Sequence, residues 1–356
     1  MLERKNKKIS DLTEVLDQQM RLFSFKYKGV MVASSGGLDS TVLFHSLYEI
    51  YKRKKNFNLA ICHINFGLRK NDSELDQRFL EDLATRVKLP IFTHKIDKST
   101  YSERDVTSTQ IWARNLRYEK FHEYAQEGWL IALGHHRDDA AENILIRLAR
   151  GTSPGAMLGL QELNLPFWRP FISIPKDKLA HWANRQQIQH REDTSNDKMI
   201  YSRNVIRHKI LPELESLFPG AKERLFRCGL EAWQLGKYCT EELKPAIDQI
   251  RSNEGLPISW FLDKEQAIKL QILSQSVGIS KKGRKAINSK FLNRVLELIE
   301  QHRLDQKFGA IQCPADGGTF YFKAKRLFLK KEQKSGTKKL KEKPRFSRNS
   351  AGHNSS

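Results

Sequence analysis

The sequence lacks the features that mark several protein classes. Its 356 residues include only four cysteines, Cys62, Cys228, Cys239 and Cys313, with no CxxC pair. Paired cysteines are typical of zinc ribbons and iron–sulfur sites, so their absence argues against both and fits a reducing compartment. No run of about 18 apolar residues occurs, and the N-terminal stretch has no apolar segment of the secretory kind. We therefore expect a cytoplasmic protein without a membrane span.

Acidic residues are scarce relative to basic ones. The chain has 62 Lys and Arg against 41 Asp and Glu, which gives a formal net charge of +21 and a pI of about 9.8. This excess is larger than solubility requires and favours a polyanionic partner, nucleic acid first, although some basic proteins bind none. The length suggests two or three domains.

A glycine loop stands between a predicted buried strand and a predicted helix. The apolar run 30–33 ends at Ser34-Ser35-Gly36-Gly37, and a helical pattern follows at once. Adjacent glycines, hydroxyl groups and a helix N-terminus together form an anion site, which favours a nucleotide phosphate as ligand. The loop contains neither the Gly-Lys-Ser/Thr of a Walker A motif nor GxGxxG. The alternative interpretation is an ordinary strand–helix turn with an N-cap.

Apolar runs and helical segments alternate along the first half of the chain. The pattern predicts strands at 29–34, 58–64, 90–96 and 129–134, and helices at about 39–54, 72–88, 108–126 and 138–150. Strands separated by such helices favour an α/β fold, a parallel sheet with helices on both faces, whose ligands bind at the carboxyl ends of the strands.

The rest of the chain predicts a second, smaller domain and a tail. We expect a catalytic domain over 1–215 and a mainly helical domain over 216–330, which ends in a β-hairpin at 308–330 with Gly317-Gly318 as its turn. Residues 331–356 carry eight Lys or Arg against two Glu and predict a disordered tail. Such a tail either holds RNA through its charge or is simply solvated.

Two further segments carry candidate chemistry. Arg114 and Arg117 lie three residues apart and share a helix face, which suits either phosphate binding or a solvated basic surface. The run Gly134 to Asn143 leaves a strand and enters a helix, so only one of His135 and His136 can easily face a site. Its two aspartates, Asp138 and Asp139, also suit the helix dipole, and the run lacks zinc-type spacing.

The motifs together resemble one family. Ser35 to Ser40 resembles the SGGxDS loop of the PP-loop ATP pyrophosphatases. Further segments resemble motifs of the tRNA(Ile)-lysidine synthases within that superfamily: HxNHGLR at 63–69, ARxxRY at 113–118, GHHxDDQxET at 134–143, RGSG from 150, RP at 169–170, EDxSN at 192–196 and RNxxRHxxLP at 203–212. Phe66, Ala140 and Asn143 depart from these patterns, since the family usually has His, Gln and Thr there.

The resemblance implies an enzyme that uses ATP and Mg²⁺ to ligate L-lysine to C2 of the wobble cytidine of a CAU-anticodon tRNA(Ile). It implies ATP-binding residues Ser35, Gly36, Gly37, Leu38, Asp39 and Ser40, with Asp39 a candidate Mg²⁺ ligand. It also implies that Asp39, Arg114, His135 and Asp139 act in catalysis. The helical domain would bind tRNA, and family members are often homodimers.

Two other functions remain open from the sequence. A PP-loop tRNA thiolase would need suitably placed cysteines, whereas Cys62 falls within the predicted second strand. A non-catalytic nucleotide- or RNA-binding module would not need His135, Arg114 and Asp139 beside the phosphate loop.

Overall fold

The computed structural model describes residues 12–21, 27–67, 71–96, 109–191, 202–277, 289–305, 311–312, 318–323 and 325–330. The predicted tail at 331–356 lies outside these residues. The chain divides into two compact units, Met1–Lys237 and Tyr238–Ser356, and the division falls within the long helix α9 (Ala221–Arg251), downstream of the predicted boundary at 215.

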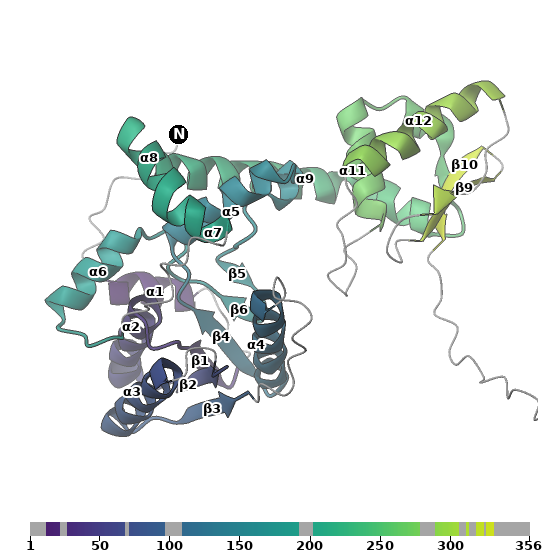
Figure 1. Ribbon diagram of the computed structural model, residues 1–356. Helices are drawn as coiled ribbons and strands as arrows, with labels where there is room; N and C mark the ends of the chain where they lie inside the picture. Colours follow the sequence, from purple (N-terminus) through teal and green to yellow (C-terminus); the bar gives the residue numbers. More distant parts are fainter. Residues whose placement is uncertain are drawn as a thin grey trace, which may run out of the picture. The chain divides into compact units, whose positions relative to one another are not determined.

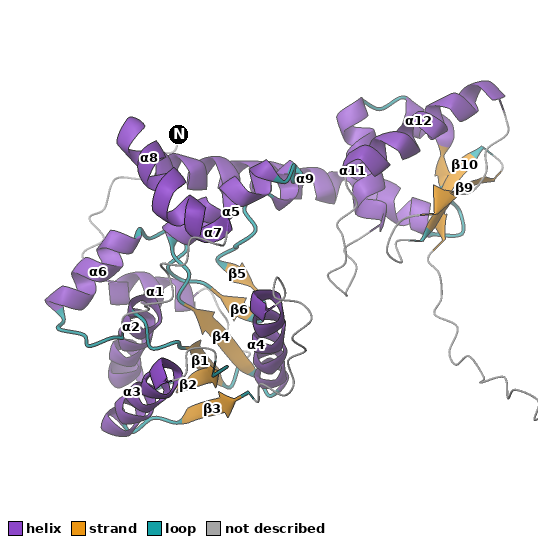
Figure 2. Ribbon diagram, in the orientation of Figure 1, coloured by secondary structure: helices purple, strands orange, loops and turns teal. Residues whose placement is uncertain are grey.

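The first unit is an α/β domain (Figures 1 and 2). Its strands are β1 (Gly29–Ala33), β2 (Asn58–Asn65), β3 (Ile91–Lys95), β4 (Trp129–Leu133), β5 (Leu163–Asn164) and β6 (Phe167–Trp168). Its helices before α9 are α1 (Leu12–Arg21), α2 (Leu38–Lys54), α3 (Asn71–Val87), α4 (Thr109–Gln126), α5 (Arg137–Ala149), the 3₁₀ turn η3 (Pro154–Ala156), α6 (Lys176–Arg185), α7 (Ser202–Val205), the π-helical turn η5 (Ile206–Ile210) and α8 (Leu211–Leu217).

The six strands form one sheet in the order β3-β2-β1-β4-β6-β5. All neighbours are parallel except β5 and β6, which run antiparallel. Ala33, the last residue of β1, lies opposite Cys62 of β2 and Leu133, the last residue of β4, so the carboxyl ends of β1 and β4 meet at the same edge of the sheet. The predicted parallel sheet with helices on both faces is confirmed, and the strand ends converge at β1 and β4.

Alternation along the strands separates two cores. Val30 and Val32 of β1 pack with Leu59 and Ile61 of β2 against α1, α2, α3 and α6. Met31 of β1 faces the other way and packs with Phe121 and Tyr124 of α4. Buried parallel strands are apolar on both faces because helices cover both. The same alternation determines toward which face of the sheet the side chains just after each strand point.

The second unit has its own core. Its helices after α9 are α10 (Ile258–Leu262), α11 (Gln266–Val277) and α12 (Ser289–Asp305), and its strands are β7 (Leu256–Pro257), β8 (Ile311–Gln312), β9 (Thr319–Lys323) and β10 (Arg326–Lys330). The strands form an antiparallel sheet in the order β7-β10-β9-β8. Phe261, Ile272, Val295 and Phe320 are among its fully buried side chains.

The predicted terminal β-hairpin is confirmed. β8 and β9 pair antiparallel, and Gly318, with φ of +93°, directly precedes β9, so the predicted turn falls between these two strands. β9 also pairs antiparallel with β10, with Lys323 opposite Arg326, so a third strand extends the hairpin. The short strands β5, β6 and β7 were not predicted, because two residues carry no periodicity. None of the described helices is both long and apolar enough to cross a membrane.

Candidate active site

The glycine loop after β1 is organised by hydroxyl groups. Ser40 Oγ accepts from the Ser35 amide at 3.2 Å and from Ser34 Oγ at 3.2 Å, and it donates to the Gly37 carbonyl at 3.1 Å. Gly36 has φ of +84°, a left-handed conformation that favours glycine. Gly37 is the N-cap of α2, so the first amides of that helix are left without partners inside the helix. The loop therefore presents donors suited to phosphate.

Two residues outside the loop, His63 and Arg191, form hydrogen bonds with its backbone carbonyl groups. His63, at the end of β2 and 5% exposed, has Nδ1 2.9 Å from the Ser34 carbonyl oxygen; because a carbonyl only accepts, Nδ1 carries the proton. The Arg191 amide donates to the Gly36 carbonyl at 2.9 Å, and Arg191 Nε donates to Asp76 Oδ1 at 3.2 Å. The loop backbone is thus fixed before any ligand arrives.

Gly134 brings the end of β4 against the start of α2. A Cβ there would lie 3.0 Å from the Asp39 carbonyl carbon and 3.1 Å from the Ser40 amide nitrogen. These are backbone atoms that cannot rotate away, so a side chain at position 134 would push α2 from the sheet. The glycine of the second motif thus lets it approach the first.

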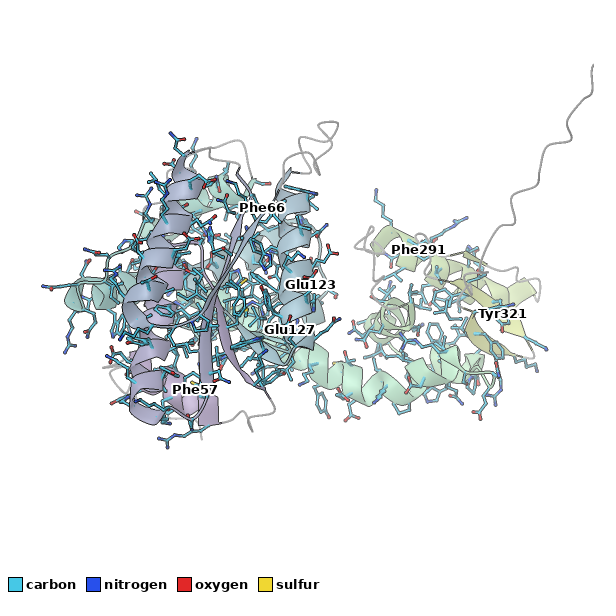
Figure 3. The ribbon with its side chains drawn as sticks, turned by 90° about the horizontal axis from the view of Figure 1, so that it is seen from below. Phe57, Phe66, Glu123, Glu127, Phe291 and Tyr321 are labelled. Atoms are coloured by element: carbon cyan, nitrogen blue, oxygen red, sulfur yellow. The ribbon has the colours of Figure 1, made fainter. Side chains whose placement is uncertain are left out.

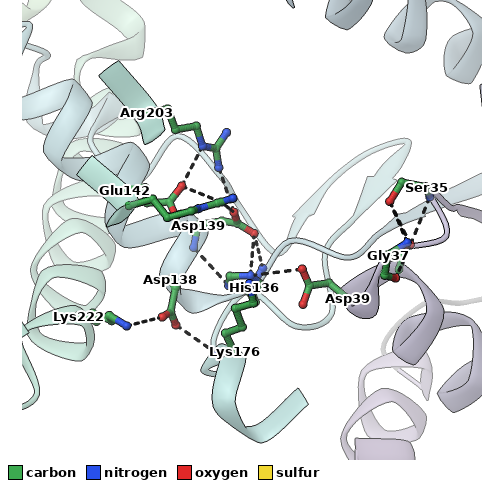
Figure 4. Close-up of polar contacts among 12 residues, drawn as sticks. Ser35, Gly37, Asp39, His136, Asp138, Asp139, Glu142, Lys176, Arg203 and Lys222 are labelled. Carbon is green, nitrogen blue, oxygen red and sulfur yellow. Dashed lines mark hydrogen bonds and ion pairs between the residues drawn. The ribbon is translucent and has the colours of Figure 1, made fainter. Parts of the chain in front are cut away.

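His136 connects the carboxylates of the two motifs (Figure 4). It is 2% exposed, and its Nε2 lies 3.6 Å from Asp39 Oδ2 and 3.4 Å from Asp139 Oδ2. Its Nδ1 accepts from the Asp139 amide at 3.3 Å, and Asp139 Oδ2 accepts from the His136 amide at 3.1 Å, which makes a capping box for α5. Burial opposes the charged form, but Asp39, Asp139 and Asp138 raise the pKa of His136 above its ordinary value.

Asp139 also receives two arginines from α7 and η5. Its Oδ1 accepts from Arg203 Nη2 at 3.0 Å and from Arg207 Nη2 at 2.8 Å. Both arginines also donate to Glu142, one turn along α5. Burial by itself would raise the pKa of Asp139, but His136, His135, Arg203 and Arg207 outweigh it and hold that pKa at about 2. The carboxylate is therefore ionised at any physiological pH.

Asp138 belongs to a separate contact. Its Oδ2 accepts from Lys222 Nζ of α9 at 2.8 Å, and its Oδ1 accepts from the Lys176 amide at the start of α6 at 3.3 Å. Burial by itself would raise the pKa of Asp138, but these donors outweigh burial and lower that pKa below its ordinary value. Of the two motif aspartates, Asp138 ties helices together, and Asp139 lies beside His136 and Asp39.

His135 is electrically neutral at pH 7. Burial and the charges of Arg169, Arg203 and Arg114 outweigh the attraction of Asp139 and lower the pKa of His135 to about 4. Its Nδ1 is buried and has no hydrogen-bond partner among the described residues. A neutral imidazole can donate or accept one hydrogen bond to a ligand but cannot act as a cation.

Arg114 lies on α4, away from the loop. Its guanidinium stacks 4.8 Å from the centre of the Tyr118 ring, and within the described part of the chain no hydrogen bond or ion pair joins it to Asp39 or Asp139. Its charge nevertheless acts on His135. Asp39, His136 and Asp139 thus form one group through direct contacts, and of the candidate site residues Arg114 is connected only to His135, through its charge.

The three departures from the family motifs have structural roles. Phe66 follows β2 and Phe57 precedes it, so the two rings lie at opposite ends of the strand (Figure 3). Phe66 packs edge-on against Trp112, with ring centres 5.9 Å apart, and the Arg117 guanidinium lies 5.5 Å from the centre of the Phe66 ring. Ala140 is fully buried beside Leu160 and Ile172. Asn143 Nδ2 donates to the Leu158 carbonyl at 3.3 Å, which holds the turn after α5.

Asp39 fits the predicted role of a Mg²⁺ ligand. Its Oδ1 is buried and accepts no hydrogen bond from the described residues, so one oxygen remains for a cation. No cluster of three or more metal-binding side chains occurs in the described part of the chain. Mg²⁺ is commonly held by one or two carboxylates together with substrate phosphates and water, so a single carboxylate beside a phosphate loop is sufficient.

The comparison with protein families agrees with this geometry. A family model described as a PP-loop domain matches residues 4–214, which include the glycine loop, His136 and Asp139. The chain belongs to the PP-loop family. Membership implies the use of ATP.

Curated relatives confirm the resemblance drawn from the motifs. A tRNA(Ile)-lysidine synthase of Petrotoga mobilis is 29% identical over 243 residues, 65% of this chain and 76% of the relative. One of Persephonella marina is 34% identical over 198 residues, 55% of this chain and 43% of the relative. The chain thus spans less than half of the second relative's length.

A solved structure shares the fold. The U34-tRNA thiolase NcsA of Methanococcus maripaludis superposes with a TM-score of 0.52 at 18% identity, over 63% of this chain and 78% of the thiolase. At this identity the likeness concerns the fold alone.

Sequence reasoning missed several residues of this group. The motifs indicate His135 rather than His136, and they include Arg203 and Arg207 in the RNxxRHxxLP segment without a role. Their spacing of four residues, which places both side chains on one helix face, was the available signal. Their partners on α5 lie more than 60 residues away in the sequence, as the separation between Arg203 and Glu142 illustrates.

Proposed function

We propose that this protein ligates L-lysine to C2 of the wobble cytidine of a CAU-anticodon tRNA(Ile), with ATP converted to AMP and pyrophosphate. The observation that carries the proposal is the group Asp39–His136–Asp139, which joins the PP-loop to the GHH motif in a chain whose curated relatives are tRNA(Ile)-lysidine synthases. The cytoplasmic location, the tRNA partner and a homodimer predicted from the sequence belong to this proposal.

The first step activates the base. The O2 atom of the cytidine attacks the α-phosphorus of ATP, an O–P bond forms, and the bond to pyrophosphate breaks. Ser35, Gly36, Gly37, Leu38, Asp39 and Ser40 would hold the departing pyrophosphate through loop and helix amides and hydroxyls. Mg²⁺ held by Asp39 would neutralise phosphate charge.

The second step replaces AMP by lysine. The ε-ammonium loses a proton to solvent and the free amine attacks C2; a C–N bond forms, the C–O bond to AMP breaks, and the proton released from nitrogen passes to solvent. Asp139 would attract and orient the amine, which must share or displace Arg203 or Arg207 at this carboxylate. With a pKa of about 2, Asp139 is a poor acceptor for a proton from an ammonium group whose ordinary pKa is near 10.4, so we assign it orientation rather than proton removal.

His135 and Arg114 would act on the phosphate side of the same reaction. Neutral His135 can donate one hydrogen bond to the AMP phosphate, and Arg114 supplies positive charge nearby. This division of roles follows from the low pKa of His135, which leaves the guanidinium as the cation.

The thiolase alternative gains no support from the described cysteines. Cys62 lies inside β2, and burial raises the pKa of its thiol to about 12, so it offers no thiolate at neutral pH. Cys228 and Cys239 lie on α9, eleven positions apart in the sequence numbering.

The test is a ligation assay with purified protein, ATP, labelled lysine and CAU-anticodon tRNA(Ile). We expect lysine-dependent labelling of the tRNA with stoichiometric AMP, and little labelling of a tRNA with another anticodon. Formation of ADP, or labelling that tolerates any anticodon, would contradict the proposal. Nucleotide and tRNA binding without turnover would support the non-catalytic module instead.

A further inference from the structure

Arg169 is a buried arginine without a counter-charge. It follows β6 directly and is 5% exposed. Its Nη1 donates to the Gln161 carbonyl at 3.2 Å, its Nε is buried without a hydrogen-bond partner, and no described carboxylate pairs with it. Burying a guanidinium is costly unless an anion and further hydrogen bonds compensate. By contrast, the half-buried Arg207 contacts two carboxylates.

The sheet places Arg169 beside the candidate site. Ala132 of β4 lies opposite Trp168 of β6, so Arg169 lies next to the end of β4, two positions before His135. β4 separates β6 from β1, which puts Arg169 about 10 Å, or two strand spacings, from the strand that carries the phosphate loop. An anion at Arg169 is therefore distinct from the pyrophosphate held by that loop.

An aromatic pair links Arg169 to Arg114. The Arg169 guanidinium lies 6.0 Å from the centre of the Phe167 ring. Phe167 meets Tyr118 edge-to-face, with centres 5.0 Å apart, and Arg114 stacks on Tyr118 at 4.8 Å. Phe167 and Tyr118 thus hold two guanidinium groups, one buried and one exposed, and the charges of both act on His135. Two positive groups around a neutral imidazole suit an oxyanion.

We propose that Arg169 binds a substrate oxyanion beside His135, with Arg114 as the second cation. The naming of this oxyanion rests on the proposed function, under which it is either the α-phosphate that leaves as AMP or the carboxylate of free lysine. Both are planar or tetrahedral oxyanions that a guanidinium can bind through two parallel hydrogen bonds.

The experiment measures binding by calorimetry, with two pairs of ligands that differ by one anionic group. AMP against adenosine reports the phosphate, and lysine against 1,5-diaminopentane reports the carboxylate. We expect the wild-type protein to prefer the member that carries the anionic group in at least one pair by about tenfold. Arg169→Gln should lose that preference, while its affinity for the member without the anionic group stays within about twofold. Arg185→Gln, which removes an exposed arginine on α6, should behave as the wild type.

Two further variants separate binding from folding. Arg169→Lys keeps the charge but not the two parallel donors, and Phe167→Leu removes the ring beside the guanidinium. Each should reduce the preference partly, even if Arg169→Gln does not fold. The proposal would be overturned if both the Arg169→Lys and the Phe167→Leu variants kept the wild-type preference in both ligand pairs. It would also be overturned if the wild-type protein preferred neither anion. Failure of the wild type to form lysidine would refute the proposed function without affecting these binding ratios.

Discussion

At the scale of single residues, His136 brings the two motifs into contact. Its ring lies between Asp39 and Asp139, and its backbone and side chain both bond Asp139. Asp139 is further held by Arg203 and Arg207. A carboxylate with so many donors is fixed in position and ionised, which suits a role in orienting a cation.

We predict that Asp139→Asn loses lysine transfer by about a hundredfold or more while it retains adenylation of the tRNA, because the attraction for the amine is removed. Single-turnover assays with and without lysine separate the two steps. Asp138→Asn is the matched control, since Asp138 contacts Lys222 and Lys176 instead, and it should transfer lysine nearly normally. Equal transfer by Asp139→Asn and the wild type would remove Asp139 from the reaction.

The lowered pKa of His135 predicts that the stability of the folded chain depends on pH. Its pKa is about 4 in the folded chain against an ordinary 6.5, so the unfolded chain takes up the proton first as the pH falls. Stability is therefore lost on acidification between these values, by about 2 kcal/mol at pH 5. Urea unfolding at pH 7.5 and pH 5 should show this extra loss in the wild type and not in His135→Asn. The raised pKa of His136 stabilises the folded chain on acidification, but it does so equally in the wild type and in His135→Asn, so it drops out of the comparison. An equal loss in the two proteins would contradict the assignment.

At the scale of elements, the site is built from helix starts at the ends of parallel strands. α2 follows β1, α5 follows β4, and Gly134 lets the start of α2 approach the end of β4 closely. α7 and η5 add Arg203 and Arg207 from a distant part of the chain. The π-helical turn at Ile206–Ile210 contains Arg207 and follows α7, which carries Arg203; such turns are frequent at functional sites.

The capping role of His136 can be separated from its contact with Asp39. His136→Ala should lower the free energy of unfolding by about 1–2 kcal/mol through loss of the α5 cap. His136→Asn can cap the helix and should regain most of that stability, but it lacks a ring nitrogen that reaches Asp39, so the KM for ATP should stay raised. Thermal unfolding and ATP kinetics on the two variants provide the measurement. If Asn restores both quantities, His136 is a cap only.

At the scale of the whole molecule, charge dominates the expected interaction with RNA. The chain carries a formal net charge of +21, of which residues 331–356 contribute eight Lys or Arg and two Glu. Binding to phosphates releases counterions, so the affinity of a basic protein for RNA falls steeply with salt.

We predict that affinity for tRNA falls about a thousandfold between 50 and 200 mM salt, as for six or more phosphate contacts. Removal of residues 331–356 should lower the slope of log affinity against log salt, because part of the charge is lost. Filter binding at several salt concentrations measures both slopes. An unchanged slope in the shortened chain would mean that the tail is only solvated.

Local pattern predicted much of the first unit. The strands β1 to β4 and the helices α2 to α5 fall within a residue or two of their predicted bounds, because burial on one or two faces leaves a periodic trace in the sequence. The predicted hairpin turn falls between β8 and β9, because a Gly-Gly pair marks a reversal, whereas no such pair separates β9 from β10. β5, β6 and β7 are too short to leave any trace.

The sequence by itself determined the phosphate loop, the parallel sheet and the family, because these depend on residues close together in the chain. Only the tertiary structure decided that His136 rather than His135 touches Asp39, that Arg203 and Arg207 reach Asp139, and that Arg169 is buried without an anion. Each of these contacts joins strand ends or helices that are distant in sequence, and its geometry follows from the register of β1, β4 and β6 and from the close approach at Gly134.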